Sequence, residues 1–413
     1  METSSSRVNS LPYSTSPRDD GGMEKINDKL YSWASIIAAN ALQQAKLTAQ
    51  LSIIDPHVAL MPDAHLGMGA TVGSVIPTVG AVIPAAVGVD IGCGMIAVRT
   101  QFTEDEVRAT HRPLSYLRGQ IERAVPLSPG RYNRKTWGLA QESIVELEKL
   151  AEVEGVQPAD FAKNWRLQLG SLGGGNHFIE VAVDQDDAVW TFLHSGSRGV
   201  GNRIARRFIK SAQQLAERRG DELPDRDLAF LTTHDVEYAE YLAHLHWAQE
   251  FARLNREVMM DRVLDQLGRF MGQDVERLDE VACHHNYSAV EEHFGQEVLV
   301  SRKGAIAAHA GARGLIPGSM GTRSYVVTGK GDEMSLCSAP HGAGREYSRT
   351  QARKTFTQDD LRERMADIEY HDHAAFVDEI PDAYKDIDVV MADAADLVRV
   401  DHVIRQIINV KGR

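Results

Sequence analysis

The amino-acid sequence predicts an α+β fold in one large mixed domain, with glycine-rich strands and loops around a central pocket and helices outside. Residues 58–100 and 166–200 are rich in Val, Ile, Ala and Gly, which is typical of strands and turns. Charged segments with apolar residues at helical spacing lie between and after them, most clearly in residues 233–270. Candidate site segments come from both halves of the chain, which favours one intertwined domain over residues 23–413.

The composition is that of a soluble protein, with 43% hydrophobic and 25% charged residues in 413. No apolar run approaches the roughly 18–20 residues that span a membrane. The N-terminus lacks the basic and then apolar pattern of a signal peptide. Three cysteines cannot all pair with one another. These features predict a protein of the reducing cytoplasm with no membrane partner.

The formal net charge of −13 argues against a nonspecific nucleic-acid coat. One segment is nevertheless basic, and within it only Glu217 is acidic. Its cations form either a solvated helix face or a local surface that positions a nucleic-acid end. Taken without the other motifs, they favour the solvated face. They are Arg203, Arg206, Arg207, Lys210, Arg218 and Arg219.

The first quarter of the chain changes character twice. Residues 1–22 are rich in Ser, Asn, Pro, Asp and Gly, which predicts a disordered tail. Residues 26–51 show a helical pattern of apolar positions. Residues 58–100 then predict strands buried on both faces.

The middle and end of the chain alternate between helix and strand signals. Residues 104–161 predict helices, with 143–153 the clearest, and 166–200 predict strands and glycine turns. Asn202 is typical of an N-cap for a helix that begins at Arg203. The longest helix is expected at 233–270, with Tyr238, Leu242, Leu245, Phe251, Leu254 and Val258 on its buried side. Nine glycines between Gly304 and Gly344 predict strands and loops, and residues 358–367 and 386–407 predict further helices.

Five potential metal ligands are dispersed along the chain, most of them among glycines. Asp90 and Cys93 stand three residues apart in a turn that can direct both side chains to one point. His177, His194 and His285 come from other segments and would complete the set. Taken singly, a buried cysteine is as often a small hydrophobic residue as a metal ligand. A single histidine beside glycines is more often a hydrogen-bonded loop residue than a ligand. His284, Cys283 and Cys337 are interpreted as structural.

His341 stands out in the segment Ser338–Arg345, where two glycines follow it. The chain has no Lys-x-Asp-Gly motif, and residues 328–331 do not complete a phosphate-binding loop. A neutral imidazole can attack phosphorus instead and form a phosphoramidate. Gly342 and Gly344 would let backbone amides approach a phosphate. The alternative is a turn histidine that caps a helix beginning near Arg345.

Six short motifs, in their order along the chain, resemble those of the RtcB-type RNA ligases, which seal tRNA halves with GTP and manganese. The resemblance runs from about Pro62 to Lys411. The bacterial form is the more similar, because of the segments Asp90-Ile91-Gly92-Cys93-Gly94 and His284-His285-Asn286-Tyr287. The other motifs are Pro62-Asp63-Ala64-His65, Gly173-Gly174-Gly175-Asn176-His177-Phe178, His194-Ser195-Gly196-Ser197-Arg198 and His341-Gly342-Ala343-Gly344-Arg345.

The resemblance implies two manganese ions that share one thiolate. Asp90, Cys93 and His177 would hold the first ion, and Cys93, His194 and His285 the second. The choice of manganese comes from the resemblance, since this donor set by affinity would favour zinc or copper. His341 would take GMP from GTP.

The resemblance also implies contacts around the bound guanylate. Arg198 would bind an RNA phosphate, for which a guanidinium is suited. The alternative for these contact residues is ordinary packing, or solvent exposure in the case of the near-terminal Lys411. The expected nucleotide-binding residues are Asp63, Asn176, Phe178, Glu180, Ser319, Gly342, Ala343, Gly344, Tyr384 and Lys411.

The function so implied is RNA ligation in tRNA splicing or RNA repair. RNA with a 2′,3′-cyclic phosphate or 3′-phosphate would be activated as RNA-3′-pp-5′-G and joined to a 5′-hydroxyl end, with an archease-like activator as a further partner. Pro340 removes one backbone donor beside His341. Two alternatives stay open: a binuclear metal-dependent phosphoesterase of RNA ends, and a non-catalytic RNA-end-binding protein with a structural metal.

Overall fold

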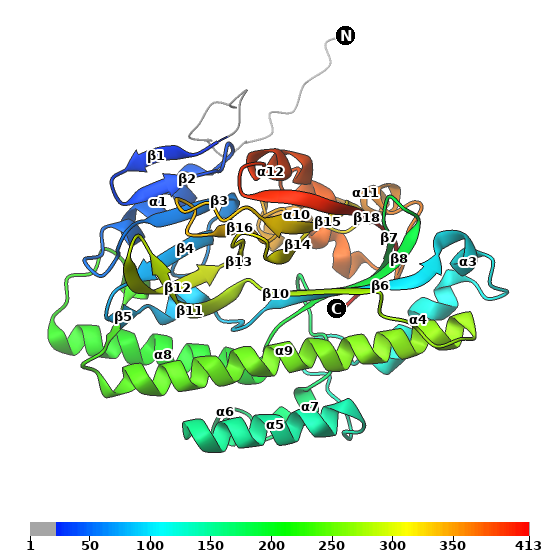
Figure 1. Ribbon diagram of the computed structural model, residues 1–413, viewed down its shortest axis with the longest axis horizontal. Coiled ribbons are helices and arrows are strands. Elements are labelled where there is room, and N and C mark those ends of the chain that lie inside the picture. The colour runs from blue at the N-terminus through cyan, green and yellow to red at the C-terminus, as the bar shows by residue number, and fades with distance from the viewer. Residues whose placement is uncertain (1–21, 413) are drawn as a thin grey trace, which may run out of the picture.

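The computed structural model describes residues 22–412. Two β-sheets lie side by side over the long helices α8 (Arg198–Arg219) and α9 (Val236–Met271) (Figure 1). This mixed arrangement confirms the α+β class. The disordered tail predicted for residues 1–22 lies outside the described residues, except for Gly22, so the domain boundary at 23 stays a prediction.

The first sheet has six strands, of which four come from residues 24–78 and two form a hairpin from much later in the chain. Strand β12 of this hairpin pairs with β4, so Leu299 lies opposite Thr78. In spatial order the strands are β1 (Glu24–Asn27), β2 (Leu30–Ser32), β3 (Val58–His65), β4 (Val72–Thr78), β12 (Gln296–Lys303) and β11 (Asn286–His293).

The second sheet has eight strands and curls until its two ends meet. Arg313 on β14 donates to both oxygens of Asp279 on β10, at 2.6 and 2.7 Å, and so links the first and last strands. The sheet is therefore nearly closed. Its order is β10 (Asp279–His284), β6 (Gly94–Thr103), β8 (Ala188–Ser195), β7 (Phe178–Val183), β18 (Val398–Lys411), β15 (Ser324–Gly329) and β14 (Arg313–Pro317), with β17 (Glu369–Tyr370) beside β18.

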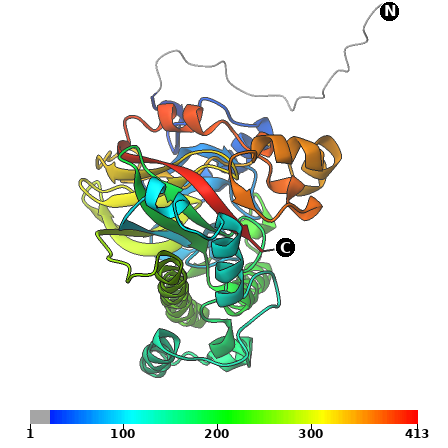
Figure 2. The same cartoon turned by 90° about the vertical axis from the view of Figure 1, so that its right-hand side faces the viewer.

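Helix α9 separates the sheets from an outer helical layer, and Figure 2 shows these layers end-on. Leu245, Phe251, Leu254 and Val258 are buried, and Tyr238 and Leu242 pack against the same core, so the expected apolar stripe is confirmed. The helix is apolar on more than one face because it also contacts α4 (Leu114–Ala124), α5 (Leu139–Glu154) and α8.

The remaining elements connect these layers. Among residues 22–412 no helix combines the length and the apolar content that crossing a bilayer requires. The connecting elements are α1 (Ala39–Ala49), α2 (Pro84–Val87), α3 (Glu104–Arg108), α6 (Pro158–Phe161), α7 (Trp165–Gln168), α10 (Arg349–Thr355), α11 (Gln358–Arg364), α12 (Ile387–Asp393), β5 (Ala81–Val82), β9 (Leu231–Thr232), β13 (Ala305–Ala307), β16 (Ser338–Pro340) and the 3-10 turns η1 (Arg226–Leu228), η2 (Ala374–Glu379) and η3 (Pro381–Ala383).

The helix predicted for residues 26–51 is wrong in its first part. Strands β1 and β2 form a hairpin there, and the backbone N–H of Lys29 donates to the Asn27 side chain at 2.9 Å. An Asn-Asp pair favours such a turn. Only the second part of the range is helical, from Ala39 onward.

Two further boundaries were predicted wrongly. Helix α8 begins at Arg198, so Asn202 lies inside it and accepts a hydrogen bond from Arg206 rather than capping the helix. The glycines around it, which disfavour a helix by themselves, permit close packing here. Residues 398–407, predicted as helix, belong to β18; their density of Val and Ile favours a strand that is buried in mid-sheet.

Candidate metal centre and nucleotide pocket

The predicted metal ligands lie where neighbouring strands of the second sheet begin or end. Cys93 precedes β6, His177 precedes β7, His194 stands near the end of β8, and His285 follows β10. These four strands are consecutive in the order β10-β6-β8-β7, and Gly94 lies opposite both Ser195 and His284. One edge of the sheet therefore gathers ligands that are nearly 200 residues apart in sequence.

Cys93, His194 and His285 form one buried cluster. The Cys93 Sγ atom lies 3.2 Å from Nε2 of His194, and this nitrogen lies 2.8 Å from Nε2 of His285. Burial lowers the pKa of both histidines well below the usual value, so both rings are held neutral. The Nε2 atoms of both histidines and the Cys93 Sγ thus face one another. A cation bound between them would accept a lone pair from each of the three atoms.

Asp90, Cys93 and His177 form a second cluster that shares the same sulfur. The Nε2 atom of His177 lies 2.9 Å from Asp90 Oδ2 and 3.4 Å from Cys93 Sγ. Its Nδ1–H donates to the Leu172 carbonyl at 2.9 Å, which leaves the lone pair of Nε2 toward the cluster. Burial opposes ionisation of Asp90, but the close contact with His177 lowers the pKa of this carboxyl to about 2.

The donor set fits a cation better than it fits an apolar core. Burial, with Asp90 next to it, raises the pKa of the Cys93 thiol well above its ordinary value in the protein alone. A coordinated cation reverses this tendency and holds the sulfur as a thiolate. The O, N and S atoms of each trio lie within 4.8 Å of one another. The two predicted trios are thus brought together as two adjoining clusters, and His284 lies outside both.

Polar residues of α9 hold the loops that carry these ligands. Buried Asn255 accepts from the backbone N–H of Gly170 at 2.7 Å and donates to the Gly196 carbonyl at 3.1 Å. The guanidinium of Arg256 donates to the carbonyls of Gly92 and Ser195 at 2.8 and 3.0 Å. The long helix therefore fixes the glycine-rich loops around Gly92, Gly170 and Gly196 relative to one another.

His341 lies beside the cluster of Cys93, His194 and His285, although it follows a different pair of strands. Strand β16 pairs with β13, and the Gly304 N–H just before β13 donates to the His285 carbonyl at 2.8 Å. The rings of His341 and His285 are consequently 4.6 Å apart between centroids. The helix that His341 was alternatively expected to cap does not begin near Arg345, because α10 starts at Arg349 with Ser348 as its N-cap.

Asp63 orients the His341 ring. The Asp63 carboxylate is fully buried on β3; its Oδ2 lies 2.6 Å from Nδ1 of His341 and accepts the backbone N–H of His341 at 3.1 Å. A proton on Nδ1 leaves the lone pair on Nε2. Within residues 22–412, Nε2 of His341 has no hydrogen-bond partner, so it is free to react.

A cavity of about 350 Å³ extends from the two clusters of potential metal ligands past His341. Of the residues expected to touch the nucleotide, only Asp63 does not line it, because this residue lies behind His341. The lining residues from the expected set are Asn176, Phe178, Glu180, Ser319, Gly342, Ala343, Gly344, Tyr384 and Lys411. Sequence-distant segments thus form one pocket.

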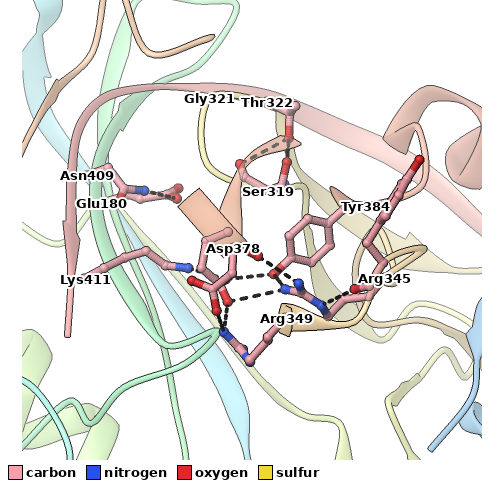
Figure 3. A network of polar contacts seen from close by, with 12 residues as sticks. Glu180, Ser319, Gly321, Thr322, Arg345, Arg349, Asp378, Tyr384, Asn409 and Lys411 are labelled. Carbon is pink, nitrogen blue, oxygen red and sulfur yellow. Dashed lines mark hydrogen bonds and ion pairs between the residues drawn. The ribbon is translucent and has the colours of Figure 1, made fainter. Parts of the chain in front are cut away.

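Buried Glu379 lines this cavity at the centre of a charged network, of which Figure 3 labels Lys411, Tyr384, Arg345 and Arg349. Its Oε2 accepts from Lys411 Nζ and from the Tyr384 hydroxyl, each at 2.7 Å. Arg349 and Arg345 contact the other oxygen. Burial opposes ionisation, but Lys411 and the two arginines lower the pKa of Glu379 to about 2. The pocket wall is therefore charged and rigidly cross-linked.

Lys411 and Tyr384 are both more constrained than their sequence positions suggested. Lys411 is only 8% exposed, which excludes the alternative of a solvent-exposed terminal lysine. The Arg345 guanidinium lies 4.8 Å from the centroid of the Tyr384 ring, so one face of this ring is already covered. Both side chains are held in place before any ligand binds.

Glu180 and Ser319 present hydrogen-bonding groups to the cavity. Glu180 Oε1 accepts from Asn409 at 3.1 Å, whereas the buried Oε2 has no partner within residues 22–412. Burial raises the pKa of Glu180 to about 8. Ser319 is positioned by Thr322, whose hydroxyl accepts the Ser319 backbone N–H at 2.6 Å (Figure 3).

Arg198 does not line the cavity. Its guanidinium lies behind His177, 3.4 Å from Nδ1, and donates to Ser171 at 3.3 Å. A Cβ atom at Gly173 would overlap this head group, so that glycine makes the room for it. The role in binding an RNA phosphate stays a prediction.

Several pocket residues were missed by sequence reasoning. Glu379, Arg349 and Asn409 have no motif around them, and Glu379 pairs with Lys411 across 32 residues. Arg345 ends the His341-Gly342-Ala343-Gly344-Arg345 motif, and this position was the only sequence feature that could have marked it as a pocket residue. Only the folded chain brings these groups to one wall.

Replacing Gly196 with alanine is expected to disrupt the Asp90 cluster selectively. The added Cβ would lie 2.3 and 2.5 Å from the two Asp90 oxygens, so the carboxylate must move. We expect bound metal to fall from two ions per chain to one, measured by elemental analysis after gel filtration. Gly119→Ala, where Cβ would meet only the flexible end of Arg123 at 3.8 Å, is the control. Retention of both ions in Gly196→Ala contradicts the assignment.

Comparison with known proteins places the chain in a family. The model of the family described as tRNA-splicing ligase RtcB matches residues 44–412. This chain belongs to the RtcB family. The RNA-splicing ligase RtcB of Escherichia coli is 46% identical over 398 residues, which cover 93% of this chain and 97% of that relative.

More distant members of the RtcB family also match over most of their length. The tRNA-splicing ligase RtcB of Pyrobaculum aerophilum is 32% identical and covers 84% of this chain and 85% of its own. The RNA-splicing ligase RtcB of Mycobacterium bovis is 31% identical, with coverage of 80% and 90%. The resemblance inferred from short motifs is confirmed over nearly the whole chain.

Proposed function

We propose that this protein is an RNA ligase that joins RNA ends bearing a 3′-phosphate or 2′,3′-cyclic phosphate to 5′-hydroxyl ends with GTP. The observation that carries the proposal is the placement of His341. Its Nε2 is free, its Nδ1 is held by Asp63, and it stands between two metal-ligand clusters and a cavity with a charged wall. The names of the relatives, RNA-splicing and tRNA-splicing ligase, support the same reaction class.

His341 is the nucleophile of the first step. Nε2 forms a bond to the α-phosphorus of GTP while the bond to the pyrophosphate oxygen breaks, so pyrophosphate leaves with its electron pair. The Nδ1 proton stays beside Asp63, which stabilises the positive charge that develops on the ring. Gly342 and Gly344 bring the backbone close to the phosphate. A Cβ at Gly344, where φ is +73°, would overlap the Asp63 carbonyl.

The later steps use the same histidine as the leaving group. The RNA 3′-phosphate attacks the guanylated phosphorus, which releases His341 and gives RNA-3′-pp-5′-G. A 2′,3′-cyclic phosphate is first hydrolysed to the 3′-phosphate. A 5′-hydroxyl then attacks the RNA phosphorus, and GMP leaves as the phosphodiester forms. Arg198 is proposed to position an RNA phosphate in these steps.

Asp90, Cys93 and His177 would hold one ion, and Cys93, His194 and His285 the other. Two manganese ions there would neutralise the negative charge that builds on phosphate oxygens in each step. The buried trios fit such ions by donor type and spacing. The preference for manganese rests on family membership, because the ligand chemistry alone would favour zinc or copper.

Glu180 is proposed to select guanine. Its buried Oε2 lacks a partner within the described residues, and the guanine edge offers two adjacent donors, N1–H and the 2-amino group. Adenine offers no such pair to a carboxylate. Lys411 and Tyr384 would complete the base site beside Ser319, which lies on the same cavity.

At a pH above 8, where Glu180 is ionised, Glu180→Gln is therefore expected to weaken GTP binding by about 10- to 150-fold, because a hydrogen bond to a charged acceptor contributes about 1.5–3 kcal/mol. The dissociation constant for GTP would be measured by calorimetry. Glu152→Gln, a similar change at an exposed position of α5, should leave it unaltered. Unchanged affinity in Glu180→Gln contradicts the assigned base contact.

The function is tested with an RNA that ends in a 2′,3′-cyclic phosphate, an RNA with a 5′-hydroxyl, GTP and Mn²⁺. A joined product that requires GTP supports the ligase. End hydrolysis without joining supports the binuclear phosphoesterase instead. Retained binding with no turnover supports the RNA-end-binding alternative. The cytoplasmic location predicted from the cysteines and an archease-like activator belong to the same proposal, and adding archease to the reaction tests the latter.

A further inference from the structure

A second hollow, of about 360 Å³, adjoins the metal and nucleotide cavity along α8. The two hollows share Met68, Ala85, Val89 and Ile209 in their linings. Val89 directly precedes the proposed ligand Asp90. The second hollow, here named the α8 groove, is lined by these four residues with Arg206, Lys210, Gln213, Arg226 and Asp227.

Two of the three cations that line the α8 groove carry charge that the protein itself does not neutralise, whereas the third, Arg226, is paired with Glu217. Within residues 22–412, no carboxylate forms an ion pair with Arg206 or Lys210, and both side chains are exposed one helical turn apart. Arg206 contacts only the neutral Asn202, at 2.9 Å. The one carboxylate of the groove, Asp227, accepts a hydrogen bond from Gln213 at 2.9 Å.

A third hollow on the other side of the nucleotide cavity provides a contrast. Its arginines, Arg345 and Arg349, are paired with Glu379, and Arg349 is also paired with Asp378. Lys385 donates to three backbone carbonyls. The cations of that hollow are therefore already engaged by other groups of the protein. The α8 groove is therefore the exit from the site that best fits a polyanion.

The groove also offers apolar contact beside the charge. Met68 is 55% exposed at the boundary of the two hollows, and Ile209 lies between Arg206 and Lys210 on the same helix. Single-stranded nucleic acid combines a charged backbone with apolar base faces, and grooves that bind it combine cations with apolar or aromatic surfaces. In a protein of net charge −13, a groove with two unpaired cations beside the candidate site is a specific feature.

We propose that the α8 groove binds the backbone of an RNA strand whose reacting end lies at the metal clusters, with Arg206 and Lys210 contacting successive phosphates. The proposal rests on the proposed function, which supplies the RNA end. It adds a path for the strand and two residues to which no role in the chemistry has been assigned.

The test measures binding of single-stranded 20-nucleotide RNAs to Arg206→Gln/Lys210→Gln by fluorescence anisotropy at several KCl concentrations. One RNA ends in a 3′-phosphate and the other in a 5′-hydroxyl. We expect about tenfold weaker binding of at least one RNA, and a slope of log affinity against log salt reduced by about 1.4, from two lost phosphate contacts on a single strand. The RNA that is affected identifies the strand in the groove.

The matched control is Arg218→Gln/Lys149→Gln, which removes the same residue types from exposed positions outside the groove. It should bind both RNAs like the wild type. Equal affinity and equal salt slope in the groove variant and the wild type overturn the proposal, as does an equal loss in the control. Covalent GMP labelling is measured in parallel. Its absence from all three proteins would count against the proposed function, while the RNA binding data still decide the groove.

Discussion

His341→Ala is expected to lose covalent labelling by GTP completely while it keeps its metal. The imidazole faces the cavity beside the metal-ligand clusters, and Asp63 holds its Nδ1 and leaves Nε2 unbound among the described residues. None of the cluster donor atoms belongs to His341. Denaturing electrophoresis after incubation with α-phosphorus-radiolabelled GTP and Mn²⁺ measures the label, and elemental analysis measures the metal.

The chemistry of the bond adds a second criterion. A histidine phosphoramidate is stable to alkali and is released by acid, so the wild-type label should show this behaviour. His309→Ala, at a half-exposed histidine between β13 and β14, should label normally. A His341→Ala protein that still labels would disprove the assigned nucleophile. No label on metal-loaded wild type would favour a phosphoesterase or a binding protein.

Cys93→Ala is expected to remove both metal ions and with them every catalytic step. Its sulfur is the one donor common to the two clusters, 3.2 Å from His194 Nε2 and 3.4 Å from His177 Nε2. Two donors remain in each trio, which leaves each ion with too few protein ligands. Elemental analysis and GMP labelling should both fall to background.

The control for this variant is Cys337→Ala, at a half-buried cysteine outside both clusters. Loss of a single buried sulfur leaves a small cavity, so Cys93→Ala should still fold, and circular dichroism checks this point. The ligand assignment fails if Cys93→Ala folds and retains two ions. Together with Gly196→Ala, which displaces only Asp90, the variant separates the shared ligand from an unshared one.

Local sequence patterns predicted the elements that are long or strongly periodic. The helix at 143–153 lies within α5, and the apolar stripe of residues 233–270 corresponds to α9. The errors occurred where a short turn or tertiary packing outweighed periodicity. Asn27 and Asp28 turn the chain between two strands, and burial in mid-sheet makes residues 398–407 part of strand β18, although they were predicted as helix.

The proposed metal ligands and nucleophile could be identified from the sequence because each stands in a short, distinctive segment. Their partners could not. Glu379 lies in a 3-10 turn with no motif, yet it contacts Lys411, Tyr384 and two arginines. Glu180 is an ordinary strand residue by sequence, and only its burial and unpartnered oxygen distinguish it.

The sequence by itself determined the α+β class, the family and the identity of the side chains with the required chemistry, because donor type and glycine-flanked turns are local properties. Only the tertiary structure decided which of them meet. Four neighbouring strands bring Cys93, His177, His194 and His285 to one edge, and the pairing of β13 with β16 brings His341 to them. Pairing between distant strands depends on the packing of the whole core, which no local segment encodes.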